Sequence, residues 1–282
     1  MRLRPSFLVM SLLALCGSPA AASAYLASDL LGQLDQNNEP VYTTSNAGVS
    51  DRMFSAPGGA TLDPTHHRLF VTDSGNSRVL IFGLADTNNL LDRIADHVLG
   101  QPDFTSSNGT TTQSGLRSPL LSAYESSTDR LFVADTLNNR VLVFDVASIT
   151  DGEPAVFVLG QPDFTSSNGT TTESGLNVPV GLALDPAARR LFVADAQNNR
   201  IMVFDVSSLT NGEPAVNVLG QPLFTTSDAT TSQTGLKNPI CASLHVGDSR
   251  LFVGDNQNHR VTVYDVSSLT SVDTQNRPMI DT

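Results

Sequence analysis

Short apolar runs separated by polar turns recur along this chain, and they have the length of β-strands. Between residues 179 and 219 the runs cover 180–184, 190–194, 200–204 and 215–219. Asp185-Pro186 is a turn signal after the first run, and the polar stretch 195–199 separates the second run from the third. No long segment shows the 3.6-residue period of a helix. We therefore predict four short antiparallel strands in this unit.

The same pattern returns about every 60 residues. The letters Leu-Phe-Val-Ala-Asp begin at Leu131 and again at Leu191, a close variant begins at Leu251, and a first copy begins at Leu69. Self-similarity at a fixed period predicts an array of equivalent supersecondary units. Four short antiparallel strands per unit is the design of a propeller blade, and a ring avoids the exposed end sheets of a straight stack. We expect an all-β fold over residues 25–282, a β-propeller of four-stranded antiparallel blades.

The last strand of each unit carries its own marker, Val-Leu-Gly-Gln-Pro, at residues 98–102, 158–162 and 218–222. One repeat later the marker is lost, because residues 278–280 read PMI. Near the other end of the chain, however, residues 30–33 read LLGQ. We predict that this segment is the outer strand of the last blade, so that four blades are closed by an N-terminal strand. The alternative is that the chain is part of a larger propeller, for instance one of six blades.

Two segments carry a resemblance to a known family. Residues 131–141 (LFVADTLNNRV) and 191–201 (LFVADAQNNRI) resemble the core of the NHL repeat, and so does Pro179-x-Gly181 ahead of the first strand. The resemblance extends over roughly residues 30–282 and implies a β-propeller of the NHL-repeat family. It does not imply a reaction, because NHL propellers serve as enzymes, RNA binders and interaction platforms.

The first 24 residues have the features of a secretory signal peptide. Arg2 and Arg4 precede an apolar run over residues 7–15, and small residues follow up to Ala24. The run is too short to span a membrane. Cys16 suggests lipid anchoring as an alternative, although Leu15 before it fits such a site poorly. We expect a secreted or periplasmic protein without membrane insertion.

Charge and cysteine content limit the partners and the means of stabilisation. Cleavage after residue 24 would remove two arginines and no acid, which takes the net charge from −12 to −14. Nucleic-acid binders need cations, and Lys237 is the single lysine of the chain, so we expect no nucleic-acid partner. Cys241 would be the one remaining cysteine, which excludes an internal disulfide. We expect it to be buried on an inner strand of a single-domain monomer.

One acidic position recurs once per repeat, at Asp73, Asp135, Asp195 and Asp255. An asparagine follows each of them after three residues and an arginine after five. Asp and Asn side chains bond backbone amides in tight turns, and arginine pairs with aspartate, so a structural role is favoured. The alternative is that the four carboxylates lie around one ring and bind Ca²⁺ near its axis, although the spacing of an EF-hand is absent. We expect no other cofactor.

Two further sets of residues are weaker candidates for a site. The ends of the first strands carry three carboxylates and one imidazole, the ingredients of a metal or acid–base cluster. Aspartate before proline is nevertheless an ordinary turn opener, and the variation between copies suits a solvent-facing turn. The histidines show no metal-ligand spacing, and no G-x-S-x-G elbow is present. The strand-end residues are Asp63, Glu125, Asp185 and His245, and the histidines are His66, His67, His97, His245 and His259.

The long loops are the most distinctive segments. Residues 98–116 and 158–176 differ only at Gln113 and Glu173, which indicates a recent duplication. We predict that these loops lie on the same face as the Asp-x-x-Asn-x-Arg turns. The favoured function is an exported, non-enzymatic scaffold that binds a protein, peptide or glycan through this loop-rich face. The alternative is a metal-dependent propeller enzyme resembling NHL-type lyases or lactone-cleaving hydrolases.

Overall fold

The computed structural model describes residues 27–269, and within them the chain is all-β apart from short 3₁₀ turns. The strands form four antiparallel sheets, which we number as blades 1 to 4 in chain order. The predicted signal peptide lies outside the described residues. Blade 1 holds β1 (Pro57–Asp63), β2 (Arg68–Asp73), β3 (Arg78–Gly83) and β4 (His97–Leu99); blade 2 holds β5 (Ser122–Glu125), β6 (Arg130–Asp135), β7 (Arg140–Asp145) and β8 (Phe157–Leu159); blade 3 holds β9 (Pro179–Asp185), β10 (Arg190–Asp195), β11 (Arg200–Asp205) and β12 (Asn217–Leu219); blade 4 holds β13 (Pro239–His245), β14 (Arg250–Asp255) and β15 (Arg260–Asp265).

The second strand of an inner blade is continuously apolar between its terminal arginine and aspartate because both of its faces are buried. In β10, Leu191 and Val193 pack in one cluster with the side chains of blade 2. Phe192 and Ala194 point to the other face and pack in a second cluster with the side chains of blade 4. All four are completely buried. Successive side chains of a strand alternate between its faces, so a sheet sandwiched between two others needs a continuous apolar run.

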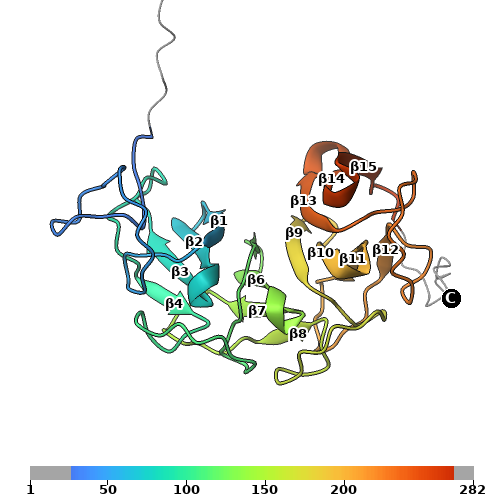
Figure 1. Cartoon of the computed structure of the whole chain (residues 1–282), viewed down its shortest axis with the longest axis horizontal. Helices are drawn as coiled ribbons and strands as arrows, with labels where there is room; N and C mark the ends of the chain where they lie inside the picture. The colour runs from blue at the N-terminus through green and yellow to red at the C-terminus, as the bar shows by residue number, and fades with distance from the viewer. Residues whose placement is uncertain (1–26, 270–282) are drawn as a thin grey trace, which may run out of the picture.

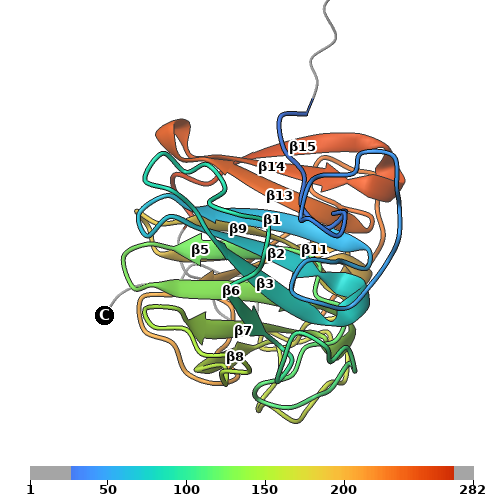
Figure 2. The ribbon, with the colours of Figure 1, turned by 90° about the vertical axis from the view of Figure 1, so that its left-hand side faces the viewer.

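The four blades follow one another around an arc (Figure 1), and the predicted β-propeller fold is confirmed. The first strands lie on the inner side of the arc, where β1 contacts β5, β5 contacts β9, and β9 contacts β13. Figure 2 shows the blades side by side, with the axes of their antiparallel strands roughly aligned. Apolar clusters fill the space between neighbouring blades.

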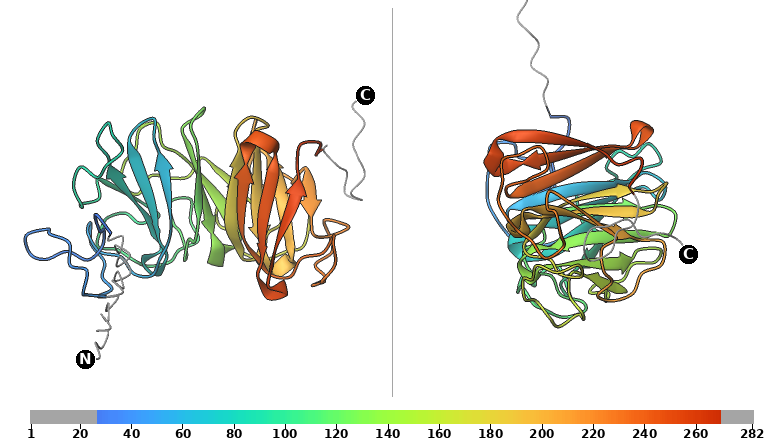
Figure 3. Two further views of the ribbon diagram at one scale, coloured as in Figure 1. Left: turned by 90° about the horizontal axis from the view of Figure 1, so that it is seen from above. Right: turned by 90° about the vertical axis from the view of Figure 1, so that its right-hand side faces the viewer.

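The predicted closure by an N-terminal strand is wrong for the described residues. Leu31 packs against the core of blade 1 together with Phe54 and Phe82, and Asp29 pairs with Arg93 of the same blade at 2.7 Å. Blade 4 has three strands in the described part of the chain, and β15 pairs with β14 alone. The first and last blades stand at opposite ends of the arc (Figure 3).

The marker explains why residues 30–33 lie where they do. In every copy the leucine before the marker glycine points into the core of the following blade, as Leu99 does with blade 2. The glycine then turns the chain with a φ of +86° at Gly100 and +92° at Gly32, a region in which side chains are strained. Leu31 and Gly32 therefore lie against blade 1 in the way that Leu99 and Gly100 lie against blade 2.

No helix in residues 27–269 is long and apolar enough to cross a membrane.

Candidate functional site

The recurrent aspartates stand at the same end of each blade, one at the C-terminal residue of each second strand. Each is followed by a 3₁₀ turn: η1 (Ser74–Asn76), η2 (Thr136–Asn138), η3 (Ala196–Asn198) and η5 (Asn256–Asn258). The residue after the turn is in the left-handed region, with φ between 52° and 54°. The four carboxylates are completely buried, and each lies within the turn of its own blade. The four aspartates are Asp73, Asp135, Asp195 and Asp255.

Each of these carboxylates accepts three hydrogen bonds from its own blade and from the loop before it. In blade 2, one oxygen of Asp135 accepts from Nε of Arg140 at 2.7 Å and from the amide of Asn138 at 2.8 Å. The other oxygen accepts from the backbone N–H of Arg117 at 2.6 Å. The same three bonds recur in the other blades. Burial raises the pKa of Asp135, while the arginine charge and the amide donors act against that rise.

The arginine of the turn fastens the loops on both sides of its blade. Nη2 of Arg140 donates to the carbonyls of Thr112 and Gly115 in the loop before blade 2, at 2.9 Å each. Nη1 donates to the carbonyl of Phe164 in the loop that follows blade 2, at 2.5 Å. We call the Asp-x-x-Asn-x-Arg turn with these bonds the bracket. The bracket thus contains the pairing of aspartate with arginine and with a backbone amide that the sequence analysis favoured.

The loops and the brackets share one face of the arc, as predicted. Asn138 accepts from the hydroxyl of Thr111 at 2.7 Å and donates to the carbonyl of Thr110 at 2.9 Å. Further along, the amide of Gln161 donates to the carbonyls of Asn139 and Asn168, both at 2.9 Å. Most of these bonds use main-chain carbonyls of the loops, and several loop side chains stay exposed, including those of Asn108 and Asn168. We call this surface the loop face.

The proposed calcium ligands are not brought together by this arrangement. The carboxylates of Asp73, Asp135, Asp195 and Asp255 each face an arginine and not a common centre. A cation at any of them would have to displace a guanidinium from a completely buried carboxylate. The calcium role stays a prediction.

The second column lies at the opposite end of the blades, and its carboxylates differ from the expected solvent-facing turn. Asp63, Glu125 and Asp185 are buried, whereas His245 is exposed. Asp185 accepts from the backbone N–H groups of the two residues after Pro186, so the turn-opener role is confirmed there. The sequence could not show the burial, because it depends on side chains from neighbouring strands and blades, such as Arg68 and Asp129 around Asp63.

A network between blades 1 and 2 was missed by sequence reasoning. Arg68 donates from Nη2 to Asp63 at 2.6 Å and to Asp129 at 3.0 Å. His66 lies 3.1 Å from Asp63, and the hydroxyl of Tyr124 donates to Asp129 at 2.5 Å. Burial raises the pKa of Asp63, but the His66 backbone N–H and Arg68 outweigh it and leave that pKa below its usual value. Burial and the bond to Asp129 raise the pKa of Tyr124.

Cys241 is exposed, in contrast to the buried position expected from the sequence. It lies on β13 at the end of the arc. The corresponding position of blade 3 is Gly181, where an added Cβ would stand 2.7 Å from the Cα of Cys241. The thiol is accessible because no sheet in the described residues covers that face of blade 4.

The chain is similar in sequence to named NHL-repeat proteins, although no family model matches it. The chain is 29% identical to NHL repeat-containing protein 2 of Homo sapiens over 175 residues, and 27% identical to that of Gallus gallus over 173 residues. Each match covers 58% of this chain and 23% of the relative, so the chain spans under a quarter of these proteins. A crystal structure of a nidogen/laminin complex matches 79% of this chain and 66% of that chain, with 18% identity and a TM-score of 0.49.

Proposed function

Because the chain belongs to the NHL-repeat β-propeller family, we propose that it is an exported, non-enzymatic scaffold that binds a protein, peptide or glycan through its loop face. The observation that carries this proposal is the way in which the loops are held. Arg140 fastens carbonyls of two loops at once, so the main chain of the face is fixed while exposed side chains are left available. A rigid polar surface of this kind binds without first paying the entropy of ordering its loops.

The proposal of a non-enzymatic role is supported by the state of the recurrent acids. A general acid or base has to reach the proton that it transfers, and a metal ligand needs free lone pairs. The carboxylates of the brackets do not fit either role, because they are completely buried and each already accepts three hydrogen bonds. On the loop face the repeated elements are instead loops rich in serine, threonine and asparagine.

Substitutions on the loop face should weaken binding, whereas matched substitutions at the other end of the blades should not. We expect N108R with N168R to weaken a ligand identified on glycan and peptide arrays by at least about 10-fold, because two large cations would stand on the recognition surface. S126R with A187R adds the same charge at exposed positions of the strand turns opposite the loop face. Binding can be measured by calorimetry.

Two results would contradict the proposed function. The first is that broad arrays of glycans, peptides and extracellular proteins return no ligand for the folded chain. The second is that both double variants weaken the ligand equally, which would place recognition away from the loop face.

A metal-dependent enzyme is the second candidate, and one observation favours it. Asp63, His66 and Asp129 offer ligand atoms that all lie within 4.8 Å of one another. Arg68 already contacts both carboxylates, which makes the set a poor fit for a cation, since like charges would compete for the same oxygens.

Metal removal separates the two candidates. We expect protein purified without chelator to contain no stoichiometric Ca²⁺ or Zn²⁺ and its melting temperature to stay the same in EDTA, because guanidinium groups neutralise the clustered carboxylates. Elemental analysis and calorimetric melting check this. One tightly bound ion per chain, with a lower melting temperature in EDTA, would support the enzyme instead.

A further inference from the structure

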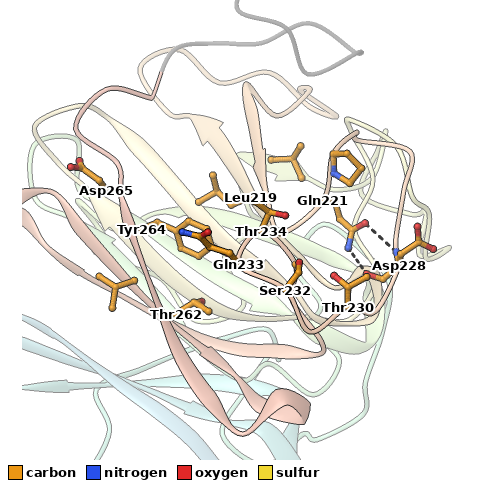
Figure 4. Close-up of a pocket in the computed structure, with 15 residues that line it drawn as sticks. Leu219, Gln221, Asp228, Thr230, Ser232, Gln233, Thr234, Thr262, Tyr264 and Asp265 are labelled. Atoms are coloured by element: carbon orange, nitrogen blue, oxygen red, sulfur yellow. Dashed lines mark hydrogen bonds between the residues drawn. The ribbon is translucent and has the colours of Figure 1, made fainter.

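Within residues 27–269, the outer edge of blade 4 lacks the strand that completes the other blades. In blades 1 to 3 the third strand pairs on both sides, for example β7 with β6 and with β8. Within the described residues β15 pairs only with β14. A cavity of about 850 Å³ borders this edge, with Thr262 and Tyr264 on one side and Gln221 and Thr230 on the other (Figure 4).

One broad face of blade 4 is apolar and exposed. Phe252, Val261 and Val263 are 41%, 64% and 53% exposed. Their counterparts one repeat earlier, Phe192, Ile201 and Val203, are completely buried against blade 4. The exposed side chains therefore have the composition of a blade interface without the neighbouring blade.

The bracket of blade 4 is incomplete on the same side. The side chain of Arg260 is 29% exposed, whereas those of Arg78, Arg140 and Arg200 are completely buried. In those three blades Nη1 donates to a carbonyl in the loop that follows the outer strand, at Phe104, Phe164 and Phe224 respectively. Nη2 of Arg260 keeps its usual acceptors, but no carbonyl in residues 27–269 accepts from its Nη1.

Residues 29–36 have the complementary features at the other end of the arc. Leu31 and Gly32 lie against blade 1 as Leu99 and Gly100 lie against blade 2. The amide of Gln33 donates to the carbonyl of Asn46 at 2.7 Å, which matches the bond from Gln101 to Asn108.

The amides of the other marker glutamines make a second bond, to the carbonyl of the residue after the 3₁₀ turn in their own blade. Gln161, for example, donates to Asn139 of blade 2. For Gln33 that residue would be His259 of blade 4. The segment 29–36 is therefore an outer strand with its loop, bonded to the following blade but not paired with a third strand of its own.

We propose that a second copy of this chain joins the two. Residues 29–31 of one copy pair antiparallel with β15 of the other, and the reciprocal contact closes two four-bladed arcs into one ring. The joint is head-to-tail, and such a contact closes when the second copy returns it. The side-chain amide of Gln33 in one copy would then donate to the carbonyl of His259 in the other. In the same joint, Nη1 of Arg260 would donate to the carbonyl of Gln36. The partner's first blade would cover the apolar face of blade 4.

Within one chain the two surfaces are held apart. Figures 1 and 3 place the segment before β1 and the strand β15 at opposite ends of the arc. The curvature between them is set by bonds from each blade to the loops on both sides, such as that from Asn139 to the carbonyl of Ser167 at 2.9 Å. The chain after Leu269 is a weaker candidate for the groove, because residues 278–280 lack the marker. The proposed two-chain assembly differs from the monomer expected from the sequence.

Disulfide cross-linking between separately prepared chains tests the joint. In the ladder of blade 2, Leu142 lies opposite Val158, and the equivalent pair across the joint is Thr262 and Leu30. In the C16S/C241S background, the variants L30C and T262C are purified as full chains with tags of different length, mixed and oxidised. We expect a covalent product that contains both tags, and two chains per particle by light scattering of the unoxidised protein.

A matched control replaces T262C by L137C, an exposed position on the loop face of blade 2 that should not link to L30C. The proposal is overturned if the mixed variants do not link, or if L30C and T262C link only when both are placed in one chain, which would mean that the ring closes on itself. It is also overturned if linking requires deletion of residues 270–282, or if the particle masses extend beyond two chains.

A second variant tests the apolar face without cysteine chemistry. V261D with V263D changes side chains that are largely exposed in the single chain, so the fold should persist. The dissociation constant of the pair should rise at least about 100-fold, because two charges would be buried in the joint. L137D serves as the control for an added surface charge. Equal dimer affinity for V261D/V263D and L137D would overturn the proposal.

Discussion

Replacing Arg140 by alanine should lower the free energy of unfolding by about 3–5 kcal/mol. The guanidinium is completely buried, and it neutralises Asp135 while it donates to carbonyls of two loops. Its loss leaves a buried carboxylate without its cation and removes one donor from each of three loop carbonyls. A typical domain is stable by about 5–15 kcal/mol, so the variant should unfold at a much lower urea concentration.

Arg52 provides the matched control for that substitution. It pairs with Asp51 at 3.1 Å on the surface, with a side chain that is 38% exposed. Such pairs contribute about 0–1 kcal/mol, so R52A should change the urea midpoint little although it removes the same charge. If R140A and R52A had equal midpoints, the bracket would have no part in stability.

Replacing Gly160 by alanine should lower the free energy of unfolding by about 2–5 kcal/mol, from backbone strain and overpacking together. Gly160 has a φ of +85°, and an added Cβ would stand 2.5 Å from the Cδ1 atom of Leu176. Leu176 is completely buried in the core between blades 2 and 3 and has no room to move. Calorimetric melting measures the effect.

Gly247 is the control for this second substitution. It lies in the exposed 3₁₀ turn η4 (Val246–Asp248) of blade 4, and an added Cβ would meet only the exposed imidazole of His245, at 3.2 Å. G247A should therefore shift the melting temperature very little. A similar small shift for G160A would mean that the marker glycine is not required by the turn.

Much of the fold was predictable because the inner blades are buried on two faces. Burial on both sides makes the middle of a second strand such as β10 continuously apolar, and the polar brackets mark where these strands end. Both features are local in the sequence and repeat with it. The loop face followed from the same periodicity, since every blade adds the same turn and the same loop.

The wrong predictions concern residues whose surroundings depend on contacts between different blades, which the repeat within one blade does not reveal. The LLGQ segment was identified as an outer strand, but a sequence cannot say which sheet such a strand will join, and its leucine packs toward the next blade instead. The network of Arg68 with Asp63 and Asp129 was missed because the two carboxylates come from different blades. The burial of Cys241 was mispredicted because it depends on a neighbouring sheet that the described chain does not supply.

The brackets also determine how freely the loop face can change its sequence. They hold Thr112, Gly115 and Phe164 by main-chain oxygens, which every amino acid possesses. Exposed side chains between these anchor points can then be exchanged without altering the path of the loop, and one duplicated loop can diverge while its twin stays intact. Foreign peptides grafted between the anchor points would be displayed in a fixed shape, so the same feature makes this propeller a starting framework for engineered recognition surfaces.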